Sequence, residues 1–359
     1  MFTFRLAGLL ACCCFVAAAP ASAETFCVGS ETTLQAALDV AASNGEPDAI
    51  RVRSGTIALE EGLYYSTFSG DHEPLFVRGG YAPGCNERTG STWLDGQDQV
   101  RVLAIALAGP DEVFLQDLNF IGGRAGASYG GNLSAILEGS GGESILLIEN
   151  CRLMFGSSEA GGAGASVSGS GWVVVRNNLF LGNVAPTSPA LSINFSGRAH
   201  VTSNTITGNT VTGDSSAAAY AHAASLSAHF WFSNNILWAN DVPALDLYLV
   251  GSGQFDLIHN DIGAVNGVAL GPESGGNLSV DPQFASCGLF CFDRPLMRSS
   301  PLVDAGRTSP PEGLSAHDLF GVDRTIGAAV DIGAYELDRL FEDGFEGGPF
   351  QLADARQVR

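Results

Sequence analysis

A six-residue pattern recurs along the middle of this 359-residue chain and constrains its fold more than any other feature. The pattern carries an aliphatic or aromatic residue at its first and sixth positions, and mostly Asn-like residues at its third and fourth. Its copies begin at Leu115, Ile148, Val175, Val201, Phe232 and Leu257, in steps of 33, 27, 26, 31 and 25 residues. A constant pattern at variable spacing indicates stacked strands whose connecting loops differ in length.

Between these hexads lie short alternating stretches that end in Gly and Ser, such as residues 165–171, 191–197 and 245–253. No stretch of helical periodicity separates them, which argues against an alternating βα fold. A propeller blade needs about 40–45 residues, too many for these steps. Repeats of short strands bury their apolar faces only by stacking. The sequence therefore predicts an all-β protein, a right-handed parallel β-helix of about nine coils and roughly 45 Å in length.

The fourth hexad position predicts a ladder of side chains inside the stack. Asparagines at one inward position of successive coils can hydrogen bond to the coils above and below, as stacked asparagines do in cross-β arrays. Cys151 stands where most copies have Asn, which predicts a small buried residue with a free thiol. The residues at this position are Leu118, Cys151, Asn178, Asn204, Asn235 and Asn260.

The N-terminal end of the stack is predicted to be covered by a short helix. Thr32 and Gln35 fit a capping box, and Gly45 is expected to end the helix. Leu34, Ala37, Leu38 and Ala41 would form its apolar face. We divide the chain into a signal peptide (1–23), the β-helix with its cap (24–280), a closing segment (281–338) and an acidic tail (339–359).

Residues 1–23 have the features of a secretory signal. Arg5 is their only charge, residues 6–19 form an apolar run too short to span a membrane, and residues 21–23 form a small-residue cleavage site. We expect export to the extracellular space or the outer cell surface. The periplasm, or lipid attachment at Cys12, are the alternatives. No later run is long enough to form a transmembrane segment.

Five cysteines remain after residue 23, and an exported protein can keep disulfides. Cys287 and Cys291 would close a short loop, and Cys27 with Cys85 would link the N-terminus to a later strand. Cys151 is then left unpaired. Zinc is the competing interpretation, but the spacing is not CxxC and no His lies close to any Cys in sequence.

The formal net charge of -21 excludes several classes of partner. All 17 basic residues are Arg, because the chain contains no Lys. A chain this anionic repels nucleic acid and anionic lipid.

Three blocks of sequence resemble a known family. The first runs from residues 34–38 through 48–50 to 55–56. The others are the hexads and an ending that comprises residues 281–284, 300–306, 318–324 and 331–336. In these blocks the chain resembles secreted bacterial right-handed parallel β-helix proteins of the pectin-lyase-like fold. The resemblance implies an N-terminal cap and a closing segment after the last coil. Residues 340–346 resemble a short C-terminal element of exported proteins from some Gram-negative bacteria.

That fold serves lyases, hydrolases, esterases, adhesins and scaffolds, so it does not select a function. A uronate lyase needs a cation and a base, commonly Arg or Lys, but no Arg lies between Arg198 and Arg294. A glycosidase needs two carboxylates across a groove. Two pairs qualify by position only, Asp241 with Asp246 and Asp256 with Asp261. The sequence therefore predicts a glycan-binding scaffold, with a polysaccharide lyase or glycoside hydrolase as the alternative.

Candidate glycan-binding residues are arginines that recur about once per coil and tryptophans that could stack on sugar rings. The competing interpretation is scattered surface charge and packed aromatic residues. Trp172 and Trp231 are further aromatic candidates, whereas His229 and His259 are expected to be surface or packed residues. The candidates are Arg152, Arg176, Arg198 and Trp238, with Arg124 at the start of the arginine series.

Acidic residues are dense near the C-terminus. Asp318, Asp323 and Asp331 could supply oxygen ligands for Ca²⁺ in this turn-rich segment. The alternative is that they cap turns and pair with Arg324.

Overall fold

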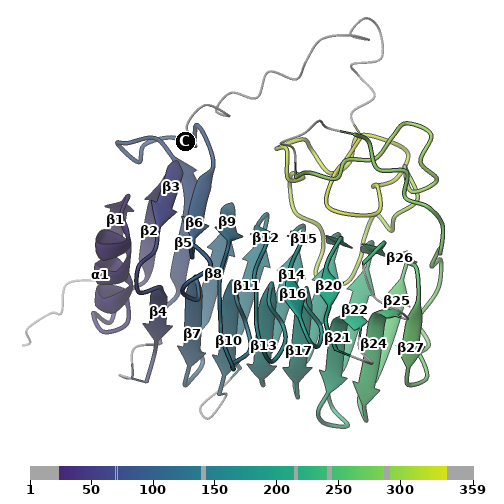
Figure 1. Ribbon diagram of the computed structural model, residues 1–359, viewed down its shortest axis with the longest axis horizontal. Helices are drawn as coiled ribbons and strands as arrows, with labels where there is room; N and C mark the ends of the chain where they lie inside the picture. Colours follow the sequence, from purple (N-terminus) through teal and green to yellow (C-terminus); the bar gives the residue numbers. More distant parts are fainter. Residues whose placement is uncertain are drawn as a thin grey trace, which may run out of the picture.

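The computed structural model describes residues 24–68, 70, 72–138, 143–213, 217–240, 245–286 and 292–337. Within these residues the protein is a parallel β-helix with one α-helix, which confirms the predicted fold class (Figure 1). Each turn of the chain passes through three parallel sheets, here called A, B and C. Eight complete turns are formed, one fewer than the sequence predicted.

The strands of each sheet follow the chain in order and pair only in parallel. Sheet A contains β1 (Glu24–Val28), β2 (Asp48–Arg53), β5 (Leu75–Tyr81), β8 (Glu112–Gln116), β11 (Ile145–Glu149), β14 (Trp172–Arg176), β18 (Arg198–Thr202), β22 (His229–Ser233) and β25 (Gln254–Ile258). Sheet B contains β3 (Gly55–Ala58), β6 (Thr92–Asp95), β9 (Leu118–Ile121), β12 (Arg152–Met154), β15 (Leu179–Leu181), β19 (Thr205–Thr207), β23 (Ile236–Trp238) and β26 (Asp261–Ile262).

Sheet C contains β4 (Leu63–Ser66), β7 (Leu103–Leu107), β10 (Leu133–Leu137), β13 (Ala165–Gly169), β17 (Leu191–Phe195), β21 (Ala217–Ala223), β24 (Leu245–Gly251) and β27 (Val265–Gly267). A small pair, β16 (Val184–Ala185) and β20 (Thr210–Val211), lies in the loops between sheets B and C. We number the turns as coils 1 to 8, beginning with β2, β3 and β4. Alternate strand residues point into one apolar core that runs the length of the stack.

The hexads form the corner between sheets A and B. Their third residues all adopt a left-handed backbone, with φ between 53° and 57°. Asn and Asp tolerate this conformation better than most residues, which explains the Asn-like third position. The fourth residue then points into the core, where Asn178, Asn204, Asn235 and Asn260 are fully buried.

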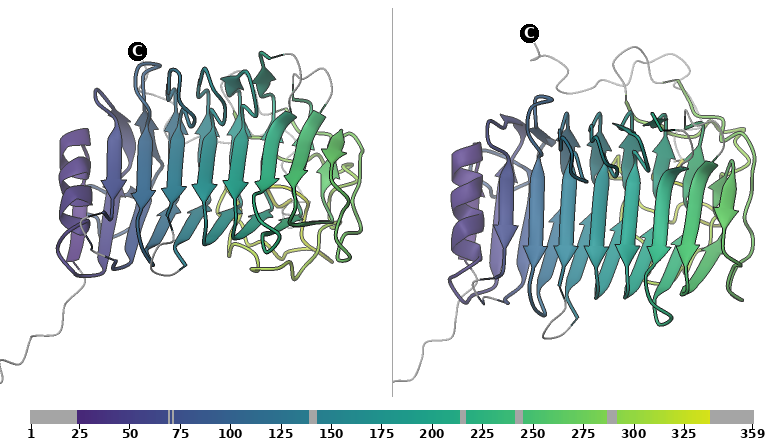
Figure 2. Two further views of the ribbon diagram at one scale, coloured as in Figure 1. Left: turned by 90° about the horizontal axis from the view of Figure 1, so that it is seen from below. Right: turned by 60° about the horizontal axis from the view of Figure 1, so that its bottom comes forward.

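The N-terminal end of the stack is covered by α1 (Glu31–Ala41), as predicted (Figure 2). Its apolar face, formed by Leu34, Ala37, Leu38 and Ala41, is buried against the first coils. The predicted capping box was placed two residues late. Ser30 is the N-cap, and its side chain exchanges hydrogen bonds with Thr33. Gln35 instead bonds both main-chain groups of Tyr64.

The segment after the last coil does more than close the end of the stack. Residues 292–337, here called the strap, lie along the outside of coils 4 to 8, at the corner between sheets A and B (Figure 1). The strap runs from Asp293 beside coil 4 to Ala305 beside coil 8 and returns to Leu319 beside coil 4. The prediction of a closing segment did not include this return path.

One predicted disulfide is formed, between Cys27 and Cys85. Cys151 is a buried free thiol, and burial raises its pKa. Cys287 and Cys291 lie outside the described residues, as do the signal-like residues 1–23 and the acidic tail.

Candidate functional site

The fourth hexad residues form a continuous ladder inside the stack. The side-chain Nδ2 of each asparagine donates to the Oδ1 of the next, at 3.0 Å from Asn178 to Asn204 and 2.9 Å from Asn204 to Asn235. The ladder continues through Asn260 to Asn277, which no hexad contains. Each Nδ2 also donates to a main-chain carbonyl of another coil, for example Asn204 to Val175. Because the side-chain amides of the ladder already have hydrogen-bond partners within the protein, we assign the ladder a structural role.

A second asparagine ladder lies at the end of sheet B. Asn183 Nδ2 donates to Asn209 Oδ1, and Asn209 Nδ2 donates to Asn240 Oδ1, both at 2.9 Å. Asn132 joins it from coil 3 with a 3.3 Å bond to Asn183. Sequence analysis missed this ladder, although its signal was available. Asn183, Asn209 and Asn240 each lie five residues after a member of the first ladder.

The third hexad residues point outward and hold the strap. Asn234 donates to the carbonyl of Arg307 at 2.9 Å and accepts from its N–H at 2.7 Å. His259, one coil on, lies 2.9 Å from the carbonyl of Ala305. Farther along the strap, Asn177 donates to the carbonyl of His317 at 3.0 Å. The corner therefore binds the main chain of the strap from several coils.

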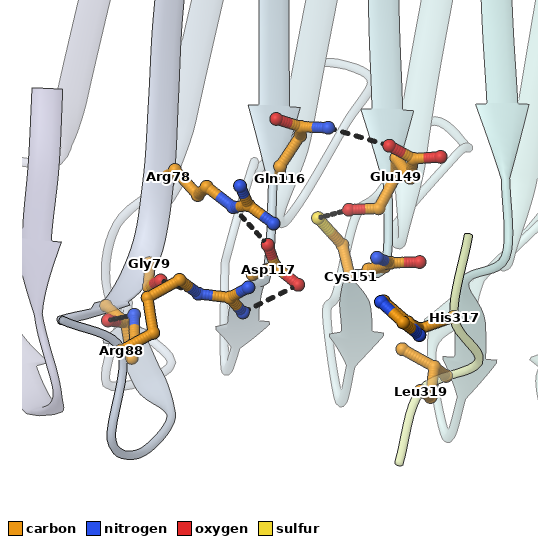
Figure 3. A network of polar contacts seen from close by, with 12 residues as sticks. Arg78, Gly79, Arg88, Gln116, Asp117, Glu149, Cys151, His317 and Leu319 are labelled. Atoms are coloured by element: carbon orange, nitrogen blue, oxygen red, sulfur yellow. Dashed lines mark hydrogen bonds and ion pairs between the residues drawn. The ribbon is translucent and has the colours of Figure 1, made fainter. Parts of the chain in front are cut away.

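Coil 3 lies beyond the strap, and its corner is closed differently. Its third hexad residue, Asp117, accepts from Arg78 at 2.6 Å and pairs with Arg88 at 2.9 Å (Figure 3). Two coils on, His317 of the strap lies at the corner instead. The outward corner position is thus occupied in both regions, by ion pairs in one and by the strap in the other.

Three of the four predicted glycan-binding residues are engaged by their own chain. Arg152 pairs with Asp293 of the strap at 2.7 Å and donates to the carbonyl of Leu319. Arg176 pairs with Glu149 at 2.7 Å. It also donates to the main chain of the strap, at the carbonyl of Glu312. These contacts give both arginines a structural role.

Trp238 packs against a separate apolar cluster beneath the strap, formed by Ile236, Leu296, Leu302 and Ile332. Arg124 is exposed, and its main chain forms an isolated parallel β-bridge with Ser157. The arginines and Trp238 are therefore not brought together as one open stripe.

Arg198, the fourth predicted glycan-binding residue, is exposed on the outer face of sheet A. Its guanidinium lies 5.8 Å from the centre of the Trp172 ring. On the following coil, the Trp231 ring stacks between His200, at 4.5 Å, and His229, at 3.4 Å. The rings of this array face one another, so few of their faces are open to a ligand.

Asp256 anchors the far end of this array. It is fully buried and accepts from His229 and Gln254, both at 2.6 Å, and hydrogen bonds hold its pKa below the usual range. Burial lowers the pKa of His200 to about 3, and the neighbouring His229 and Arg198 lower it further. Glu312 of the strap lies 3.8 Å from His200.

The predicted pair of Asp256 and Asp261 is divided between two sheets. Asp256 belongs to sheet A and bonds His229, whereas Asp261 lies on sheet B and accepts from the N–H of Val280. Burial raises the pKa of Asp261 to about 6, and the Asp246 carboxylate contributes. Asp246 accepts from Asn240 and from a main-chain N–H. Asp241 lies outside the described residues.

The candidate calcium ligands serve different local structures. Asp318 accepts hydrogen bonds from the N–H groups of Phe320, Val322 and Glu336. Asp331 accepts them from the N–H groups of Asp304 and Leu337. Asp323 is exposed and pairs with His317 at 2.9 Å. No cluster of three or more His, Cys, Asp or Glu side chains suited to a metal occurs in the described ranges. The geometry favours the turn-capping interpretation, and calcium binding stays a prediction.

Buried Arg324 lies at the centre of the strap. Its Nη2 donates to the carbonyls of Asp331 and Gly333, and its Nη1 lies 3.7 Å from Glu336. Burial raises the pKa of Glu336 to about 8, although Arg324 opposes the shift. This cluster stabilises the fold of the strap.

The outer face of sheet C differs from the other surfaces. Its outward residues include Ile136, Asn194 and Tyr248, which are all exposed. Tyr220 and Tyr248 are register partners, with ring centres 6.1 Å apart. Burial raises the pKa of Tyr220, and the neighbouring Tyr248 and Tyr129 contribute. Sequence analysis did not select these tyrosines, because their strands lie between the hexads.

Neither a membrane-spanning helix nor a similar known protein indicates a function for the described part of the chain. The described residues contain no helix long and apolar enough to cross a membrane. No family model, curated protein or solved structure matches the chain.

Proposed function

We propose that this protein is an exported β-helix scaffold that binds an extracellular or cell-surface glycan on the outer face of sheet C. One observation carries the proposal. Along this face an aromatic pair, Tyr220 and Tyr248, stands among side chains that are mostly exposed or partly exposed, whereas the strap engages the corner side chains of coils 4, 5, 7 and 8. Aromatic side chains that combine an apolar ring with a polar tip suit sugar rings.

Two features support export. Residues 1–23 have the composition of a signal peptide. The Cys27–Cys85 disulfide is of a kind that persists in oxidising compartments. The net charge of -21 supports a partner that is neither nucleic acid nor an anionic membrane.

The scaffold proposal is favoured over a lyase or hydrolase by the contacts of the candidate catalytic groups. Asp246, Asp256 and Asp261 are buried and bonded to their own chain. A general acid or base must come within hydrogen-bond reach of the substrate, and burial opposes this.

The test is to incubate residues 24–359 with neutral and uronate polysaccharides, with calcium and with a chelator. New reducing ends and retention of the protein on each polymer are measured together. We expect retention without new ends. Cleavage of the polymer would overturn the scaffold proposal in favour of an enzyme. If the protein neither cleaved nor retained any polymer, the glycan-binding proposal would be wrong.

A further inference from the structure

The outer face of sheet C consists of two columns of side chains that run along the stack, one residue per coil. The first column contains Tyr64, Ala104, Ser134, Ser166, Ser192, Tyr220, Tyr248 and Asn266. The second contains Ser66, Ala106, Ile136, Ser168, Asn194, His222 and Val250. Successive members lie about 4.8 Å apart, the spacing of neighbouring strands.

These two columns contain no Arg, Asp or Glu, although the chain is strongly charged. Sheet A provides the contrast, because one of its outward columns contains Arg51, Arg78, Gln116, Glu149 and Arg176. Carboxylate and sulfate groups are recognised in proteins mainly by Arg and Lys. In the columns of sheet C only His222 can carry a charge.

The chemistry changes along the columns. In coils 6 and 7, Tyr220 and Tyr248 form an aromatic end, and the side chain of His222 lies 6.4 Å from Tyr220. In coils 3 and 4 the columns present the hydroxyl groups of Ser134, Ser166 and Ser168, which can donate and accept hydrogen bonds, and in coil 5 they present the exposed amide of Asn194. The face is two side chains wide over seven coils, which suits an elongated ligand parallel to the stack.

From this arrangement we infer that sheet C binds an uncharged glycan that lies along the stack, with one sugar on Tyr220 and Tyr248 and the next sugars over Asn194 of coil 5 and the serines of coils 4 and 3. The inference rests on the proposed function and specifies its ligand. It excludes uronates and sulfated glycans as the preferred class.

The experiment measures binding of residues 24–359 to amylose, mixed-linkage β-glucan and galactomannan, and to polygalacturonate and alginate as charged probes. Affinity electrophoresis gives a Kd for each polymer. The variants are Tyr248→Ala and Tyr220→Ala at the aromatic end. The matched controls are Tyr64→Ala, at the other end of the same column, and Arg198→Ala on sheet A. Thermal unfolding checks that all variants fold.

We expect at least one neutral polymer to bind, with Kd raised tenfold or more by Tyr248→Ala and less than twofold by each control. Retention of only the charged polymers, still weakened by Tyr248→Ala, would overturn this inference while the proposed function stands. Weakening by Arg198→Ala and not by Tyr248→Ala would place the site on sheet A and overturn both. Absence of binding to every polymer would also remove both.

Discussion

The corner between sheets A and B and the outer face of sheet C are built alike, yet they differ in what occupies them. Each presents one column residue per coil on a parallel stack. At the corner, Asn177 and Asn234 bond the main chain of the strap. On sheet C, Asn194 and Tyr248 are exposed. A repeating column can thus hold the protein's own chain or remain open to a ligand, and the hydrogen bonds of its side chains tell the two cases apart.

The largest effect is expected where the strap's internal structure is broken. Arg324→Ala leaves Asp318, Asp331 and Glu336 buried without their cation, and loss of one partner of a buried pair costs about 3–5 kcal/mol. We expect the strap to become sensitive to proteolysis while glycan binding on sheet C persists. Equal protease resistance in the variant would contradict the role given to Arg324.

Removal of one ladder asparagine should cost less, but should affect the stack itself. Asn204→Ala removes the acceptor of the Asn178 N–H and leaves the Val175 carbonyl without its side-chain donor. We expect the free energy of unfolding in urea to fall by about 1–3 kcal/mol. Ser166→Ala on the open face is the control, expected within about 0.5 kcal/mol of wild type. Similar losses in both variants would remove the distinction between inward and outward columns.

The strap should also respond to pH. Because the folded pKa of Glu336 is raised to about 8, the folded state holds its proton more tightly than the unfolded state. Stability contributed by this group is therefore present below its ordinary pKa and is lost as pH rises towards 8. In Glu336→Gln, the resistance of the strap to proteolysis should fall less between pH 6 and pH 8 than it does in the wild type. An unchanged slope in the variant would assign the dependence to another group.

Calcium should have the smallest effect. The carboxylates of Asp318 and Asp331 already accept main-chain N–H groups, so binding an ion would require those bonds to break. We expect the melting temperature to change by no more than about 1 °C in saturating calcium, since only a ligand that binds the folded state raises it. A clear rise, lost in Asp331→Asn, would restore the calcium hypothesis.

Features that depend on local periodicity could be predicted from the sequence. The hexads indicated the corner and the inward asparagines, and the spacing of Leu34 and Leu38 indicated the capping helix. The second ladder was missed because Asn183 and Asn209 lie outside the hexad, although they follow it at a fixed distance.

Features that depend on distant contacts could not be predicted. Arg152 bonds Asp293, which lies 141 residues away in the sequence. No sequence periodicity predicts which charged residues the strap covers. Tyr220 and Tyr248 are adjacent only because the connecting loops bring β21 and β24 into register. The candidate site could therefore be identified only from the structure, whereas the fold class could be predicted from the sequence.

Hydrogen–deuterium exchange of residues 24–359, with and without the neutral polymer that binds most tightly, tests the central claim most directly. A bound glycan protects the amides it orders or covers. We predict added protection in β10, β13, β17, β21 and β24 of sheet C and no change in the strap. Protection confined to the strap or to sheet A would contradict the assignment of the open face as the binding site.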